Sequence, residues 1–407
     1  MKLAAPVFLF LSAFALHAAE PSMEKQDLFT ANELGYKVYH IPGIVVTAKG
    51  TVLAWCEARK KGGDWDQIDV LMRRSTDNGK TWTEPVKISQ APEGVTKNPF
   101  SLAVKGVNPK DVTCNNPVFI ADRDGTVHGL YCVEYMRCFY IRSGDEGANW
   151  SKPVEITKTF EDFHKSYDWK VLATGPDHAI QTGKGRLVVP IWLSTGTGGN
   201  AHRPSVTAII YSDDQGKTWH AGEIAIAGND EIINPNETVV VELANGGVML
   251  NARSESKAHR RLVTVSKDGA TGWSKPKFDD SLWEPICMGS IVRFSTKDNG
   301  GKNRILFCNP DNLSRADGKE QPGKNRDRKN VSVKLSYDEA QTWPVNKAVE
   351  PGPSGYSDIA VAKDGTILCF YGRGDIKDFG GYAFNHLTLA RFNLEWLTDG
   401  KDSATAH

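Results

Sequence analysis

Candidate residues for chemistry in this sequence include one of its tyrosines, one of its histidines, several acids and several arginines. Tyr356 lies in SGYSDIAV, and Glu237 precedes Arg253 by sixteen residues in NPNETVVVELANGGVMLNAR. An arginine can bind a carboxylate through two parallel hydrogen bonds, and an acid can protonate a departing oxygen. Each residue alone also has an ordinary structural interpretation: a tyrosine packed on a strand, a solvated loop carboxylate, or an arginine that bridges two sheets.

Two other segments carry further arginines and acids. NRDRKN contains Arg326 and Arg328, while EARKKGGDWDQID contains Arg59 and, five residues later, Asp64. Asp64 follows two glycines, a composition that is usual in turns. It is the joint presence of these residue types, in one order along the chain, that favours a shared site.

Residue spacing argues against several other kinds of site. The seven cysteines include no CxxC pair and the chain has no HExxH segment, so a zinc site is not expected. Segments such as ILFCNP and TILCFYG favour buried thiols, and the odd number leaves at least one of them unpaired. The glycine-rich stretch 195–200 has no following Gly-Lys-Ser/Thr, so it predicts a flexible loop rather than a phosphate-binding loop.

An internal repeat indicates the elements that must position these residues. STDNGKTW, SGDEGANW and SDDQGKTW fit the pattern S-x-D-x-G-x-x-W, and SKDGATGW and SYDEAQTW are degraded copies. The copies begin at 75, 143, 212, 266 and 336, with spacings of 68, 69, 54 and 70 residues. Such a period suits a four-stranded sheet with its loops, which is one blade of a propeller. In each copy Ser and Asp can bond nearby backbone amides, Gly can take a positive φ, and Trp can pack the turn against the blade.

The rest of the chain is patterned for strands. Helical periodicity is nearly absent, and apolar residues alternate in twos or run four to six long between Gly, Asp and Pro. Five repeats and an N-terminal strand that closes the ring predict an all-β, six-bladed β-propeller with Asp-box hairpins. Propeller loops meet at one end of the central channel, so a site there can collect residues from distant blades.

These repeats and segments resemble the sialidase (neuraminidase) family of six-bladed propellers. The resemblance implies a tyrosine nucleophile, since an acid in that role would be repelled by the carboxylate of a sialic acid. It implies Tyr356 as the nucleophile, Glu237 as the base that activates it, and Asp64 as the acid that protonates the departing oxygen. Asp66 and Asp69 stay open as alternatives to Asp64.

The same resemblance, which covers about residues 34–395, implies how the substrate is held. Arg253 and Arg328 match arginines that bind the substrate carboxylate, and Arg326 is close enough to be a rival of Arg328. Arg59 is expected beside the acid, where it holds the loop or a sugar hydroxyl. No metal or organic cofactor is implied, because side chains stabilise the charge.

Two further segments are expected to reach the sugar. Asn116 in CNNPVFIADRDG is predicted to contact the substituents of the sugar ring. Gln181, with a neighbouring histidine in TGPDHAIQ, is predicted to approach the rim of the site.

One corner of the site departs from the family pattern. The family's first arginine, in an Arg-Ile-Pro segment, is replaced by His40, and a glutamate sixteen residues after the nucleophile is replaced by Gly372. Loss of only one partner would leave a buried charge at a cost of about 3–5 kcal/mol, so the double change indicates a rebuilt corner.

Two interpretations of His40 are open. In the first it meets the substrate carboxylate and holds its proton there, so that binding strengthens below neutral pH, and Arg373 supplies part of the missing charge. In the second it is a packing residue. The first is favoured because the nucleophile, base and acid are all still present.

Composition and the N-terminal segment bear on location. Lys+Arg and Asp+Glu both number 49, so net charge favours neither nucleic acid nor an acidic membrane surface. Residues 1–19 predict a cleaved signal peptide, with one lysine, an apolar run and small residues at its end. We expect a short N-terminal lead over 20–33 and one catalytic propeller over 34–400. No later segment is apolar enough to cross a bilayer, so the protein is expected to be secreted, periplasmic or held at the cell surface.

The sequence therefore predicts a secreted retaining exo-α-sialidase that acts on sialylated glycans: glycoproteins, mucins, glycolipids or oligosaccharides. The same residues fit a propeller hydrolase for another acidic keto-sugar. A non-catalytic glycan-binding propeller is a third possibility. Linkage preference, and the choice between hydrolysis, transfer and an anhydro-forming reaction, depend on loops and stay open.

Overall fold

The structure is a computed structural model that describes residues 19–104, 106–376 and 384–404. The predicted signal peptide lies almost wholly outside the described residues. Strands predominate among them, and the helical elements are short: α1 (Pro99–Leu102), the 3-10 helix η1 (Thr157–Lys165), α2 (Lys297–Gly300) and α3 (Leu394–Leu397). None of the helices in the described part is long and apolar enough to cross a membrane.

Four sheets contain four or five strands each. The first has the order β2 (Val38–Val46), β3 (Val52–Arg59), β4 (Ile68–Ser75), β5 (Val86–Lys87). The second has the order β11 (Asp177–His178), β6 (Cys114–Ala121), β7 (Val127–Val133), β8 (Arg137–Ser143), β9 (Val154–Glu155). The third has the order β10 (Val171–Thr174), β13 (Leu187–Ser194), β14 (Ser205–Ser212), β15 (His220–Ile226), with β12 (Ile180–Gln181) also paired to β13. The fourth has the order β16 (Thr238–Glu242), β17 (Val248–Ala252), β18 (Arg260–Ser266), β19 (Lys277–Trp283).

The fifth sheet is larger than one blade. Its seven strands have the order β1 (Met23–Thr30), β25 (His386–Phe392), β24 (Ile367–Arg373), β23 (Val345–Val361), β22 (Lys329–Ser336), β21 (Arg304–Pro310), β20 (Ser290–Ser295). The long strand β23 pairs with β22 through its first half and with β24 through its second half. The all-β prediction is confirmed, and the described strands form four blade-sized sheets and one seven-stranded sheet.

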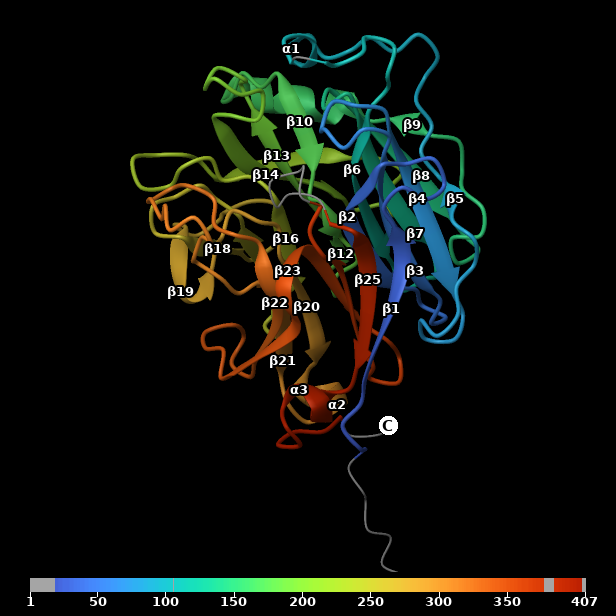
Figure 1. The fold of residues 1–407 in the computed structure, drawn as a ribbon, viewed down its shortest axis with the longest axis vertical. Coiled ribbons are helices and arrows are strands. Elements are labelled where there is room, and N and C mark those ends of the chain that lie inside the picture. Colours follow the sequence, from blue (N-terminus) through green and yellow to red (C-terminus); the bar gives the residue numbers. More distant parts are fainter. Residues whose placement is uncertain (1–18, 105, 377–383, 405–407) are drawn as a thin grey trace, which may run out of the picture.

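The sheets pack in succession to form a propeller. Buried apolar clusters join the first sheet to the second, the second to the third, the third to the fourth, and the fourth to the fifth. A further cluster joins the fifth sheet back to the first, which closes the ring. Strand β1 runs antiparallel beside β25, so the N-terminal strand completes the sheet formed by the C-terminal part of the chain (Figure 1).

The repeated turns have the geometry that their sequence predicts. In the first copy the Ser75 hydroxyl donates to Asp77 Oδ1 at 2.7 Å, and Gly79 N donates to Ser75 Oγ at 2.8 Å. Gly79 has φ +79° and packs near Trp82. In the last copy Ala340 takes this position with φ 62°, so the degraded sequence keeps the turn.

A buried carboxylate ties the inner strands together near the site. Asp358 in β23 accepts hydrogen bonds from Ile44 N (2.8 Å), His178 Nδ1 (2.7 Å) and Ser290 Oγ (2.6 Å). Burial acts to lower the pKa of His178, but the charge and hydrogen bond of Asp358 outweigh it and raise the pKa. An ion pair therefore joins β11 to β23, and the hydrogen bond from Ile44 N ties a third sheet to the same carboxylate.

The cysteines match their predicted role. All seven are free and buried, so they act as small apolar side chains of the core.

Candidate active site

A cavity of about 340 Å³ lies where several inner strands begin. Its walls come from the starts of β2 and β6, from segments just before β16 and β22, and from β23. Residues that are far apart in the sequence meet here. Eight residues singled out from the sequence line it: His40, Arg59, Asp64, Asn116, Glu237, Arg253, Arg328 and Tyr356.

Tyr356 lies at the base of this cavity with only 4% of its surface exposed. Its hydroxyl donates to Glu237 Oε1 and accepts from Arg253 Nη1 at 2.7 Å. Burial raises the pKa of Tyr356 well above its ordinary value; Arg253 opposes that shift and Glu237 adds to it. The phenol is therefore neutral in the free cavity, and its proton already points at a carboxylate that can accept it.

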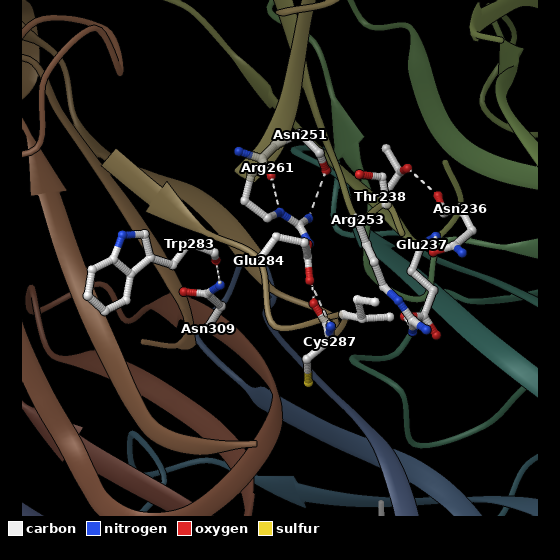
Figure 2. A network of polar contacts seen from close by, with 12 residues as sticks. Asn236, Glu237, Thr238, Asn251, Arg253, Arg261, Trp283, Glu284, Cys287 and Asn309 are labelled. Atoms are coloured by element: carbon white, nitrogen blue, oxygen red, sulfur yellow. Dashed lines mark hydrogen bonds and ion pairs between the residues drawn. The ribbon is translucent and has the colours of Figure 1, made fainter. Parts of the chain in front are cut away.

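Glu237 and Arg253 meet because of the register of one hairpin. Thr238 pairs with Ala252 across β16 and β17, so the residues just outside that pair face each other. Arg253 N donates to Glu237 O at 2.9 Å, and the Arg253 guanidinium forms an ion pair with the Glu237 carboxylate (Figure 2). The spacing of sixteen residues is therefore set by strand pairing.

Arg328 approaches the same tyrosine from another sheet. Its guanidinium carbon lies 5.0 Å from the centre of the Tyr356 ring, and Nη2 donates to Ile286 O at 2.9 Å. A guanidinium over an aromatic face is a favourable contact. Arg326, the alternative considered from the sequence, does not line the cavity; its Nη1 donates to the carbonyls of Gln321 and Lys324.

A buried ion pair between Arg261 and Glu284, both shown in Figure 2, fixes the turn that contacts Arg328. Arg261 is fully buried and donates to Glu284 Oε2 at 2.6 Å. Glu284 Oε1 accepts from Cys287 N at 2.8 Å, which closes the turn that contains Ile286. Because Ile286 O accepts from Arg328, the pair supports that arginine through the turn.

Arg59 is held between two carboxylates at the end of β3. Its Nε and Nη2 donate to Glu57 Oε2 at 2.9 and 2.6 Å, and Nη1 donates to Asp64 Oδ1 at 2.7 Å. The other oxygen of the fully buried Glu57 accepts from Asn116 N at 2.7 Å. Asn116 has φ 49° beside a bulge of β6, so Glu57 fixes both an arginine and a strained backbone position.

Asp64 lies at the mouth of the cavity with about half of its side chain exposed, 49%. Burial acts to raise its pKa, but Arg59 and His202 outweigh it and lower the pKa of Asp64 to about 2. The carboxyl is therefore ionised in the free cavity. The two alternatives do not line the cavity: Asp66 accepts from Gly63 N at 2.6 Å, and Asp69 pairs with Lys87.

The space beside Gly372, where the sequence predicted a change from the family pattern, is filled by an aromatic ring. A side-chain carbon at Gly372 would lie 2.5 Å from Phe384, and one at Gly355 would lie 2.3 Å from the same ring. Phe384 therefore leaves no room for a side chain at position 372. Arg373 does not replace the missing charge, contrary to the sequence expectation, because its guanidinium pairs with Asp27 at 2.7 Å outside the cavity.

The structure gives the charge state of His40 in the free cavity. Burial, then the charges of Arg59 and Arg328, lower the pKa of His40 well below its ordinary value. The imidazole is therefore neutral in the free cavity. The expectation that the ring holds a proton beside a bound carboxylate stays a prediction.

Comparisons with known proteins bear on this geometry. Residues 50–369 match the family described as BNR repeat-like domain. The chain belongs to this family. A sialidase of Micromonospora viridifaciens is 30% identical over 404 residues, which cover 93% of this chain and 55% of that protein. A sialidase of Bacteroides fragilis is 28% identical over 352 residues, which cover 82% of this chain and 59% of that protein.

A solved structure is also similar to this chain. The structure of the Hadza microbial sialidase Hz136 matches it with a TM-score of 0.72 at 25% identity, over 92% of this chain and 69% of that one. The chain spans little more than half the length of the two relatives named above.

Several residues of the cavity of this BNR repeat-like protein were not found from the sequence. Tyr135, Trp192 and His202 line one wall, with ring centres 5.0 Å apart for Tyr135 and His202 and 5.3 Å apart for Trp192 and His202. They come from loops and strands without a shared motif, so no sequence signal joins them. Glu57 could have been found, since it precedes Arg59 by two residues and therefore lies on the same strand face.

Gln181 lies apart from these residues, which corrects the sequence prediction. It lines a second cavity, of about 500 Å³, where the inner strands end. Its Oε1 accepts from Arg123 N at 3.0 Å, and the neighbouring His178 is engaged with Asp358. We therefore do not assign Gln181 to the site. Among the described residues of this BNR repeat-like chain, no group of three or more His, Cys, Asp or Glu side chains could hold a metal ion.

Proposed function

We propose that this protein is a secreted retaining exo-α-sialidase that hydrolyses terminal α-linked sialic acids of sialylated glycans. The observation that carries the proposal is the hydroxyl of Tyr356, which donates to Glu237 and accepts from Arg253 inside a closed-in cavity. A second arginine, Arg328, contacts the same ring. The sialidases among its relatives support the reaction class.

The first half of the reaction forms a bond between the enzyme and the sugar. The Tyr356 oxygen attacks the anomeric carbon while its proton passes to Glu237. The glycosidic bond breaks, its electron pair goes to the departing oxygen, and Asp64 protonates that oxygen. Arg253 and Arg328 hold the carboxylate of the sugar, which two guanidinium groups can bind through parallel hydrogen bonds.

The second half releases the sugar. Asp64, now ionised, removes a proton from a water that attacks the anomeric carbon. The bond to Tyr356 breaks, and the phenolate recovers its proton from Glu237. Asp64 must start the cycle protonated, although its pKa in the free cavity is about 2. A bound sugar that covers Asp64 and adds a negative charge would raise that pKa, since both effects favour the neutral acid.

The remaining elements of the proposal concern the number of blades and the export of the protein. The two halves of β23 pair with different strands, which supports counting the seven-stranded sheet as two blades and the propeller as six-bladed. The apolar N-terminal segment supports cleavage near residue 19 and secretion. Amino-terminal sequencing of the exported protein tests that cleavage.

Release of free sialic acid from a simple α-sialoside, followed from pH 4 to pH 8, tests the activity. Y356F should lose turnover by at least about a hundredfold, because it removes the nucleophilic oxygen, while affinity for the sugar is retained. Y371F is the matched control, since Tyr371 is a buried tyrosine whose hydroxyl donates to Glu350 outside the cavity. Absence of turnover on every sialoside linkage, with folded protein, would refute the sialidase assignment.

The rebuilt corner favours one alternative substrate class. His40 lines the cavity in place of the arginine that the resemblance implies, and Phe384 fills the space beside Gly372, which favours another acidic keto-sugar as the alternative substrate. Turnover of such a glycoside with none of an α-sialoside would support that alternative. If both the wild type and Y356F bind the sugar and neither forms product, the result would instead indicate a glycan-binding propeller.

A further inference from the structure

His40 is an unpartnered imidazole in the wall of the cavity. It lies in β2 beside a bulge between His40 and Gly43, and only 7% of its surface is exposed. Its ring centre lies 4.4 Å from that of Tyr356, which itself is hydrogen-bonded to Glu237. Nδ1 is buried and has no hydrogen-bond partner in the described part of the chain. Buried polar atoms are normally satisfied, so an unsatisfied one that borders a cavity indicates a missing ligand.

The charges that face His40 come from three other parts of the propeller. Arg59 ends β3, Arg253 follows β17, and Arg328 precedes β22, while Asp64 lies in the loop after β3. Burial of the ring and the three guanidinium groups disfavour a positive imidazole, and Asp64 favours it. The balance in the free cavity leaves the ring neutral.

A bound anion reverses this balance. A carboxylate between the guanidinium groups and the ring offsets part of their repulsion and accepts a hydrogen bond from the protonated imidazole. We propose that His40 is the third contact of the substrate carboxylate and that it takes up one proton from solvent when the ligand binds. This rests on the proposed function for the identity of the ligand. The ligand keeps its negative charge, so His40 consumes one proton for each molecule bound.

The consequence is an affinity that depends on pH. Where the free ring is neutral and the bound ring is charged, the dissociation constant falls up to about tenfold for each unit by which pH is lowered. Arg253 and Arg328 are charged throughout this range and add no dependence. His40 therefore makes the site selective for anionic sugars under mildly acidic conditions.

Isothermal titration with 2-deoxy-2,3-didehydro-N-acetylneuraminic acid at pH 7 tests the proton uptake. D64N protein is titrated in phosphate and in Tris, because the two buffers release a proton with different enthalpies and because Asp64 is itself proposed to take up a proton when the sugar binds. We expect an enthalpy difference equal to the uptake of up to one proton, and a dissociation constant that falls from pH 8 to pH 6. The double variant D64N/H40Q should show neither effect. D64N/H202Q is the matched control, since His202 is the other histidine that lines this cavity, and it should keep the proton uptake.

The outcomes separate this inference from the proposed function. Binding without proton uptake by D64N, or uptake that persists in D64N/H40Q, overturns the role of His40 and leaves the sialidase assignment intact. Uptake that is lost in D64N/H202Q but kept in D64N/H40Q overturns it as well. Failure of the ligand to bind, with no turnover of any sialoside by the wild type, overturns both. The two-buffer comparison of D64N requires no change at His40, so the inference stays testable if D64N/H40Q does not fold.

Discussion

Asp177 is a buried acid whose replacement should stabilise the protein. It has no exposed surface, and neither carboxylate oxygen has a hydrogen-bond partner among the described residues. Its φ is 77°, in the left-handed region. Burial is the largest influence on its pKa, and the neighbouring charge of Asp358 adds to it, so the pKa of Asp177 is raised well above its ordinary value. The folded protein therefore keeps a proton that the unfolded chain loses.

The sign and size of the effect follow from that proton. An unfolded Asp ionises near pH 3.9, so above about pH 4 the unfolded state gains stability that the folded state does not share. Each pH unit then lowers the free energy of unfolding by about 1.4 kcal/mol, until the raised pKa of folded Asp177 is reached. D177N keeps the shape and tolerates the left-handed backbone but cannot ionise. The free energy of unfolding of D177N, relative to that of the wild type, should therefore rise by about 2 kcal/mol between pH 4 and pH 6.

Urea unfolding followed by tryptophan fluorescence, at each pH from 4 to 8, measures this difference. D177G should be stabilised too, because glycine relieves a left-handed conformation that costs other residues about 1 kcal/mol, but it gives up the side-chain packing. D358N is the contrasting control, since Asp358 accepts several buried hydrogen bonds and its loss should cost about 1–3 kcal/mol. A difference between D177N and wild type that does not change with pH would refute the reasoning.

Three other substitutions have expected outcomes. G147A should lose about 2 kcal/mol of unfolding free energy in urea titrations, because residue 147 has φ +74° and a new carbon would lie 2.9 Å from Leu53. G372A should lower the free energy of unfolding by about 1–3 kcal/mol, because the new carbon clashes with Phe384. In protein that already carries F384A, the same substitution should lower it no further. An equal loss with and without F384A would contradict this packing contact. E284Q should lower stability by about 3 kcal/mol, by breaking the buried pair with Arg261. Titration calorimetry of E284Q should also show weaker binding of the sialic acid analogue, and unchanged affinity would contradict the supporting role of this pair.

Much of the framework could be read from local sequence. The Ser-x-Asp turns form because their own side chains and a positive φ specify them within eight residues, as the contacts of Ser75 and Asp77 illustrate. The spacing of Glu237 and Arg253 is local in the same sense, since one hairpin register makes them face each other. Strand periodicity predicted the all-β fold because alternating side chains must separate a buried face from an outer face.

Other parts of the site could not be predicted, because they depend on contacts between segments far apart in the chain. The order of residue types along the chain does not distinguish Arg328 from Arg326 as the arginine of the site. Contacts of Arg328 with the carbonyl of Ile286 and the ring of Tyr356 do distinguish them. Gln181 was assigned to the wrong end of the inner strands, since a strand pattern gives the face of a residue but not the end that borders the cavity.

The sequence by itself determined the strands, the repeated turns and the residue types of the site, because these follow from interactions over a few residues. Only the tertiary structure decided the charge state of His40 and the filling of the corner by Phe384. The physical reason is that a pKa and a close packing contact are sums over every neighbour in space. For His40 the charged neighbours come from several sheets that meet only when the ring of the propeller has closed, and for Phe384 the neighbours lie on strands β23 and β24 of one sheet.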